Sequence, residues 1–146
     1  MPKKTPKRLK FKFRKLREKL NGFEIDIYTT RGHEYPTPNG MPATVKISGA
    51  EYEIRYHSHI YATPHASARL MGMVMYGLRT IFIDPIWSIH EMRESLYHEI
   101  AHVYLHNWQQ KKGSLAKLTP EQIEEFCDLF AEGFYDACKA NPGLTG

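Results

Sequence analysis

Two segments in the second half of the chain carry the start and stop signals of α-helices. The first opens at Ser88, and Glu91 three residues later completes a capping box, in which each residue's side chain bonds to the backbone of the other. The helical pattern continues to about Gln110 and stops before Gly113. We therefore expect one helix from Ser88 to about Gln110.

The second segment opens in the same way. Thr119 is the expected N-cap, Pro120 occupies the first helical position and Gln122 closes the box. The pattern ends around residues 141–143, where Asn-Pro-Gly is a typical helix stop. Apolar residues recur along this segment with helical spacing, which predicts a face directed at the core. They are Ile123, Phe126, Cys127, Phe130, Phe134, Ala137 and Cys138.

The chain before these helices has the pattern of short strands. Residues 31–42 are dense in Gly, Pro and Asn and predict a loop, and residues 43–57 predict two strands joined at Ser48-Gly49. Residues 80–84 form the clearest strand, which Pro85 ends. We expect an α+β fold, with a small antiparallel sheet packed against the two helices.

At 146 residues and 42% hydrophobic content, the chain has the size of one compact domain, which we expect to span residues 21–146. No run approaches the roughly 18 to 20 apolar residues of a membrane-spanning helix, and the start lacks the apolar stretch of a secretory signal. Cys127 and Cys138 would lie about 16 Å apart along one helix, too far for a disulfide. These features predict reduced thiols, no membrane contact and a cytoplasmic location.

The basic charge of the chain is concentrated at its start. Residues 1–20 carry ten Lys or Arg and one acid, which leaves ten bases and fifteen acids, a net charge of −5, for the rest. Residues 1–8 are expected to form a disordered arm. Beyond them we favour a short basic helix ending near Leu20, although Leu9, Phe11 and Phe13 alternate as in a strand. Such a block usually stays solvated; nucleic acid, anionic lipid or an acidic partner is the alternative.

The first predicted helix carries the pattern H-E-x-x-H at His98, Glu99 and His102. Residues four apart lie on one face of a helix, so both imidazoles can bind one Zn²⁺, while the Glu points at the water on the metal without ligating it. Zinc lowers the pKa of that water toward about 7. Glu99 is therefore the expected general base, which takes a proton and delivers it to a leaving amine.

A third ligand has to come from elsewhere in the chain. A His ten residues after the first would indicate a metzincin, but that position is Trp108. Glu124 and Asp128 share one face of the second helix, so we expect Glu124 to ligate and Asp128 to accept a hydrogen bond from a ligating His. Glu125, which points about 100° away, is the fallback ligand.

His106 continues the four-residue series of His98 and His102 but would lie about 12 Å along the axis from His98, beyond the reach of one metal. We expect it to support the ligands or to cap the helix. A peptidase of this type also needs a side chain that stabilises the tetrahedral intermediate. The candidates, among which the sequence does not choose, are the nine tyrosines and His57, His59, His65 and His90.

These residues resemble the short IrrE/ImmA-like zinc peptidases, which are frequent in phages and other mobile elements. The resemblance spans residues 44–144 and rests on four stretches: Leu70-Met-Gly72 with a hairpin into Ile81-Phe-Ile-Asp84, Glu94-Ser-Leu-Tyr-His-Glu-Ile-Ala-His102, Leu118-Thr-Pro-Glu-Gln-Ile-Glu124 and Asn141-Pro-Gly-Leu144. The family's Glu, small residue, Asn or Asp, and Phe-Ala pattern is similar to Glu124, Cys127, Asp128 and Phe130-Ala131, with Cys in place of the usual Ala.

The resemblance implies a zincin-like fold and a gluzincin-type site, with two His and one Glu around Zn²⁺, in an enzyme that hydrolyses a protein or peptide substrate. Some members cleave a DNA-bound repressor, and a phage-encoded member would act in the host cytoplasm. Two other functions stay open. One is a catalytically silent zinc-binding interaction protein, and the other is a DNA-associated protease recruited through residues 1–20.

Overall fold

A computed structural model provides the structure of the chain. It describes residues 13–20, 23–30, 34–58, 60–61, 70–111 and 113–144, with the backbone alone for the first two ranges. Within these ranges the protein is a mixed α+β structure with a small mixed sheet and two long helices. No helix of the described ranges combines the length and the apolar character needed to cross a membrane.

The main sheet has five strands in the order β3-β5-β8-β7, with β4 also paired to β5. The strands are β3 (Glu34–Tyr35), β4 (Thr44–Ile47), β5 (Ala50–His57), β7 (Gly72–Met75) and β8 (Thr80–Ile83). The expectation of a wholly antiparallel sheet is wrong, because β8 lies parallel to β5. The chain enters β8 only after β6 and β7, and a connection of that length allows a strand to return in the same direction.

The hairpin predicted over residues 43–57 is confirmed. β4 pairs with β5 in antiparallel register, from Thr44 opposite Glu53 to Ile47 opposite Ala50. The two residues between the strands, Ser48 and Gly49, have φ angles of 51° and 80°. Two successive positive φ angles are typical of the tight turns whose twist matches that of a hairpin. The strand predicted over residues 80–84 is also confirmed, as β8.

A second, three-stranded sheet contains β1 (Phe13–Leu20), β2 (Phe23–Thr30) and β6 (Ile60–Tyr61). The short helix expected to end near Leu20 is therefore wrong. β1 pairs along its whole length with β2. The apolar spacing within residues 13–20 contains no information about this partner. The backbone hydrogen bonds to β2 favour the strand over a helical conformation of the same residues. Residues 1–8, the expected arm, lie outside the described residues.

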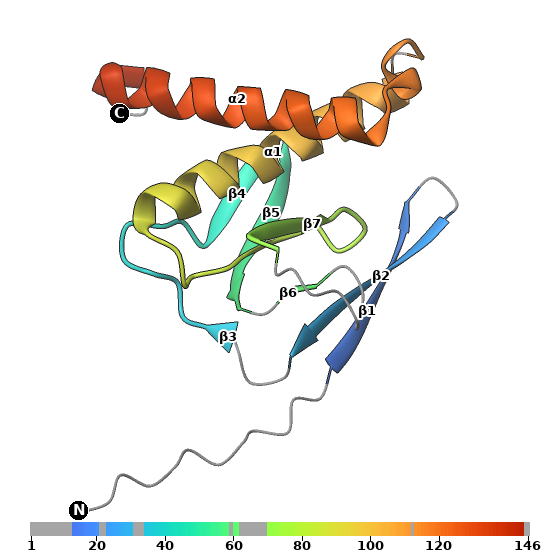
Figure 1. The fold of residues 1–146 in the computed structure, drawn as a ribbon, viewed down its shortest axis with the longest axis horizontal. Helices are drawn as coiled ribbons and strands as arrows, with labels where there is room; N and C mark the ends of the chain where they lie inside the picture. The colour runs from blue at the N-terminus through green and yellow to red at the C-terminus, as the bar shows by residue number, and fades with distance from the viewer. Residues whose placement is uncertain are drawn as a thin grey trace, which may run out of the picture.

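The two predicted helices are confirmed as α1 (Ile89–Lys111) and α2 (Pro120–Ala140). Glu91 accepts bonds from the Ser88 amide and hydroxyl, both at 3.0 Å, and the Thr119–Gln122 capping box is complete. Short 3₁₀ turns follow the helices, namely η1 (Leu115–Lys117) and η2 (Pro142–Leu144). Figure 1 shows α1 lying across the main sheet and α2 lying across α1, so α1 is the middle layer.

The largest core lies between the main sheet and α1. It contains the buried side chains of one sheet face and the inner side of α1: Ile47, Tyr52, Ile54, Tyr56, Val74, Ile81, Ile83, Met92, Leu96 and Val103, with Met41. The opposite sheet face has a smaller cluster of Ile60, Met75 and Phe82. The burial of α1 on the sheet therefore fixes the helix that carries the H-E-x-x-H pattern.

The core-facing stripe predicted for α2 is correct only in part. Cys127 is fully buried and packs with Ala101 and Leu105 of α1, whereas Phe126, Phe130 and Phe134 are 40%, 38% and 40% exposed. α2 packs on another helix rather than on a sheet, and a helix covers only a narrow strip of its neighbour. The three phenylalanine rings stack on one another along the side of α2 instead. Both cysteines are free thiols, as expected.

Candidate metal centre

The side chains of His98, His102 and Glu124 converge between α1 and α2. Both histidines come from successive turns of α1, and Glu124 comes from the first half of α2. The two imidazole Nε2 atoms are 3.0 Å apart. One carboxylate oxygen of Glu124 lies 3.2 Å from the His98 Nε2, and the other lies 2.9 Å from the His102 Nε2. One possible ligand atom from each of the three residues lies within 4.8 Å of the other two.

These separations are compatible with one tetrahedral zinc ion. Ligand atoms about 2.0 to 2.1 Å from such an ion lie about 3.3 Å from one another. The contacts of His98 point the same way. Its Nδ1 lies 2.8 Å from an Asp128 oxygen, which can accept a hydrogen bond from it. The other ring nitrogen, Nε2, faces a carboxylate oxygen of Glu124, and a ligating His commonly has this kind of carboxylate partner on its second nitrogen.

The state of His102 also suits a metal ligand. Its side chain is 15% exposed, and this burial lowers its pKa, although the Glu124 carboxylate acts in the opposite direction. A lowered pKa keeps the imidazole neutral near pH 7, and neutral imidazole is the form that binds metals. Asp128 holds the ring of the other histidine, which is the role that the sequence predicted for it.

Glu99, one residue after His98, is buried although it carries an ionisable group. Burial, together with the negative charges of Glu124 and Asp128, raises its pKa from the usual 4.5 to about 8. No hydrogen-bond partner of its carboxyl group is recorded among the described residues. Burying an ionised carboxyl group without a partner costs free energy. A positive charge or a hydrogen-bond donor beside Glu99 would reduce this cost.

An open cleft of about 780 Å³ lies beside these residues, between β7, α1 and α2. The strand side of the cleft is apolar, whereas the helices contribute ionisable side chains. The residues that line it are Leu70, Met71, Gly72, Met73, Val74, Tyr76, Glu91, Glu94, Ser95, His98, Glu99, His102, Glu124, Asp128, Ala131 and Glu132. The candidate ligands and the buried Glu99 therefore face a space that another molecule can enter.

β7 forms the edge of the main sheet on this side. The Asp84 amide donates to the Met71 carbonyl at 2.9 Å, so these two residues form a hydrogen-bonded pair across β7 and β8. Such pairs alternate with non-bonded ones along an antiparallel ladder. The backbone groups of Gly72 and Val74 consequently face the outer edge, where no partner is recorded within the described part of the chain. Within the described residues, the outer edge of β7 is therefore unpaired from Gly72 to Val74, whereas Leu70, just before the strand, is bridged to Ile60.

Gly72 allows β7 to approach α1 closely. A Cβ atom at this position would lie 2.8 Å from the Ser95 Oγ and 3.1 Å from the Glu99 Cγ. Any larger residue would require the Ser95 hydroxyl to turn away and its neighbours to move by a few tenths of an ångström, so glycine allows the closest approach here. Gly72 therefore helps to set the distance between the strand edge and Glu99.

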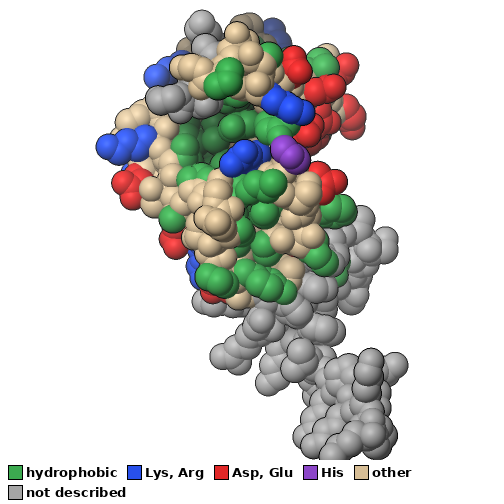
Figure 2. Space-filling view, turned by 90° about the vertical axis from the view of Figure 1, so that its left-hand side faces the viewer, with side chains coloured by type: hydrophobic (Ala, Val, Ile, Leu, Met, Phe, Trp, Pro, Cys, Tyr) green, Lys and Arg blue, Asp and Glu red, His purple; other side chains and the backbone are tan. Residues whose placement is uncertain are grey.

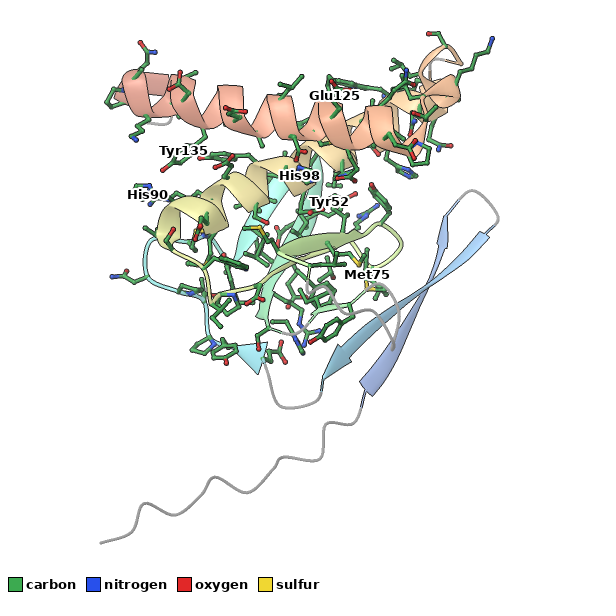
Figure 3. All side chains as sticks on the ribbon, viewed as in Figure 1. Tyr52, Met75, His90, His98, Glu125 and Tyr135 are labelled. Carbon is green, nitrogen blue, oxygen red and sulfur yellow. The ribbon has the colours of Figure 1, made fainter. Side chains whose placement is uncertain are left out.

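Other residues considered from the sequence lie elsewhere. Glu125, the fallback ligand, is on the outward side of α2 (Figure 3). His106 stacks on the ring of Tyr76, with ring centroids 4.1 Å apart, and no contact with the candidate ligands is recorded for it. His90 contacts the Tyr135 hydroxyl, joining the start of α1 to α2. His57 bonds to the Ser58 carbonyl on β5. His59 and His65 lie outside the described residues.

The sequence did not single out three features of the cleft. Gly72 was named only within the stretch Leu70-Met-Gly72 of the family resemblance, although a glycine inside a strand often marks a close approach. Glu94 lies four residues before His98, so the helix period alone would have placed it on the same face. Tyr76 lines the cleft and donates a hydrogen bond to the His102 carbonyl at 3.4 Å, which no local pattern signals.

Comparison of the chain with models of protein families, with curated proteins and with solved structures found no match.

Proposed function

We propose that this chain is a zinc-dependent peptidase, with His98, His102 and Glu124 as metal ligands and Glu99 as general base. The observation that carries the proposal is the convergence of His98, His102 and Glu124 from two helices, with one possible ligand atom of each within 4.8 Å of the others, at a cleft that a buried carboxyl group also lines. A zinc ion held there would act as a Lewis acid on the scissile carbonyl and would acidify a water molecule.

The protein side chains would divide the remaining work. Glu99 would accept a proton from the attacking water and pass it to the nitrogen of the leaving amine. Asp128 would keep His98 in the tautomer that presents Nε2 to the metal. Among the described residues, Tyr76 is the tyrosine that lines the cleft. We propose that its hydroxyl donates a hydrogen bond to the negatively charged oxygen that develops in the reaction.

The unpaired edge of β7 supports a peptide as the substrate. An extended peptide can add to an open strand edge through main-chain hydrogen bonds. The outward backbone groups of Gly72 and Val74 would then hold the substrate in line with the candidate metal centre. This mode binds any extended chain and leaves selectivity to the side chains around the cleft.

The zincin-like arrangement and the IrrE/ImmA-like resemblance belong to the same proposal. Their support is a sheet with an open edge strand, a helix across it that carries H-E-x-x-H, and a following helix that supplies the carboxylate. A silent zinc-binding protein would not need a buried acid beside the ligands, so Glu99 favours the hydrolytic function over that alternative.

Metal content is the first test. Elemental mass spectrometry should find about one zinc per folded chain, because two neutral imidazoles and one carboxylate form a complete catalytic ligand set. His102→Ala should lose the metal and Glu124→Gln should bind it more weakly. Glu125→Gln, which changes the neighbouring acid on the outward side of α2, should retain it. A wild-type chain that takes up no zinc after reconstitution would overturn the proposal.

Glu99→Gln tests the catalytic step separately from metal binding. The variant should keep its zinc, because Glu99 is not a ligand, and should hydrolyse peptides at least about 10²-fold more slowly, as expected when a general base is removed. The measurement is the rate of peptide hydrolysis by zinc-loaded wild type and variant. Equal rates would show that Glu99 is not the base.

A further inference from the structure

The cleft beside the candidate metal centre is strongly acidic. Six of its sixteen lining residues are Asp or Glu, and none of these described residues is Lys or Arg. Glu99, Glu124 and Asp128 belong to the candidate centre itself. The other three acids, Glu91, Glu94 and Glu132, have no role in the proposed reaction. Their charge needs an explanation of its own.

These additional acids lie at one end of the cleft. Glu91 is engaged at the start of α1, where it accepts two hydrogen bonds from Ser88. Glu94 and Glu132 are exposed, and no ion pair to either is recorded within the described ranges. Both also line an adjoining hollow of about 490 Å³ together with Asp136 and Lys139, where three acids face one base. In Figure 2 the largest group of acidic side chains is at the upper right, beside α2.

The distance from the candidate ligands to these acids can be expressed in residues of a bound peptide. Glu94 precedes His98 by one helical turn, a rise of about 6 Å, and Glu91 precedes it by about 10 Å. An extended peptide on the edge of β7 advances about 3.3 Å per residue. Leu70 already pairs with Ile60, so the main chain of the peptide would leave the strand edge beyond Gly72. A side chain two to four residues from the bond that is cut would still lie opposite this end of the cleft.

We propose that the cleft selects peptides with a Lys or Arg about two to four residues from the cleaved bond, and that Glu94 and Glu132 bind this basic side chain. The inference rests on the proposed peptidase function and adds its substrate class. A flexible Lys or a forked Arg side chain can reach two carboxylates at once. The main chain of the peptide would pair with β7, and the acids would supply the selectivity that this pairing lacks.

Binding is the first measurement, and it does not depend on hydrolysis. The full-length Glu99→Gln chain, loaded with zinc, is titrated into two fluorescent ten-residue peptides that differ only in carrying Lys or Gln at alternate positions. The Lys peptide should bind about tenfold more tightly, and rising salt should remove the difference because the pairs are exposed. Equal affinities, or no measurable binding of either peptide, would overturn the inference.

Matched variants locate the interaction. Adding Glu94→Gln and Glu132→Gln together should abolish the preference for the Lys peptide. The control pair Glu121→Gln and Glu125→Gln removes the same charge from α2, at residues that do not line the cleft, and should keep the preference. A preference that survives the first pair of substitutions would mean that the basic peptide binds elsewhere, and the inference would be wrong.

Mapping of cleavage sites then separates the inference from the proposed function. The zinc-loaded wild type is incubated with a randomised peptide mixture, and the cut positions are read by mass spectrometry. Lys or Arg should be enriched two to four residues from the cut, and Glu94→Gln with Glu132→Gln should remove the enrichment. Cuts without that enrichment would overturn the inference and leave the peptidase standing. Absence of any cut, with the binding preference intact, would overturn only the peptidase.

Discussion

At the scale of single residues, the helical spacing of the candidate ligands could be predicted from the sequence. The contacts that other parts of the chain make around them could not. His98 and His102 follow from the helix period, and Glu124 and Asp128 share a face of α2 for the same reason. The structure brings these four side chains together. The close approach at Gly72 depends on how β7 meets α1, a tertiary distance that no local pattern contains.

Gly72→Ala should destabilise the fold and disturb Glu99. The new Cβ would lie 2.8 Å from the Ser95 Oγ and 3.1 Å from the Phe82 carbonyl oxygen, so the Ser95 side chain must turn and the strand backbone must shift slightly. Overpacking of this kind costs about 1 to 3 kcal/mol in the free energy of unfolding. Urea unfolding measures the loss, and peptide hydrolysis should fall with it. Wild-type stability in the variant would show that β7 and α1 are less tightly apposed.

Tyr56 gives a residue-level prediction for high pH. Its hydroxyl donates to the Pro42 carbonyl at 2.5 Å, and burial raises its pKa from the usual 10.0 to about 12. Because the folded state favours the neutral phenol, this stability is fully present below pH 10 and is lost as pH rises through about 12. The free energy of unfolding should fall by about 2 kcal/mol by pH 12.

The comparison with Tyr56→Phe isolates this effect. Near pH 8 the variant should be about 1 kcal/mol less stable than the wild type, because the Pro42 carbonyl loses its donor. The difference should shrink above pH 10 and reverse toward pH 12, since phenylalanine does not ionise. Urea unfolding across this range tests it. A difference that is constant with pH would contradict the raised pKa.

At the scale of elements, those defined by short-range signals were predicted well. Capping boxes act within four residues, and both helices begin where these boxes predicted. The parallel pairing of β5 with β8 joins segments more than twenty residues apart, and the strand β1 depends on its partner β2. Apolar spacing on α2 likewise indicated a helix but not how much of its surface another element would cover.

Gly133 in the middle of α2 allows a stabilising substitution. A Cβ atom there meets no atom within 4 Å, and the residue lies well inside the helix. Alanine is more favourable than glycine in a helix interior by about 0.8 to 1.0 kcal/mol. Gly133→Ala should raise the free energy of unfolding by about this amount, measured by urea unfolding. Gly133→Ala is also the matched control for Gly72→Ala, since the same substitution should change the free energy of unfolding in the opposite direction.

At the scale of the whole molecule, the candidate metal centre lies at the interface between the two helical layers. Within the described residues α2 packs on α1 and makes no comparable contact with the sheet (Figure 1). Its fully buried residues are Cys127 and Ala131. The ligand set spans this small interface, since Glu124 comes from α2 and both histidines come from α1. A bound ion would therefore act as a clamp between the layers.

Removal of metal should consequently loosen α2 before the sheet. Binding to the native state alone stabilises a protein by about 4 kcal/mol when free metal exceeds its Kd a thousandfold, so a chelator should lower the Tm of the zinc-loaded chain. Without the ion, Glu124 and Asp128 place two negative charges beside Glu99, whose pKa they raise, and no bound cation offsets them. Hydrogen exchange should rise first in α2, while β5 and β8 remain protected by the core beneath α1.

Glu124→Gln should show the faster α2 exchange even before chelation, with little further change on adding chelator. A uniform rise across α2, β5 and β8 would instead mean that the ion stabilises the fold as one unit, and that the layers are not joined mainly through the candidate centre.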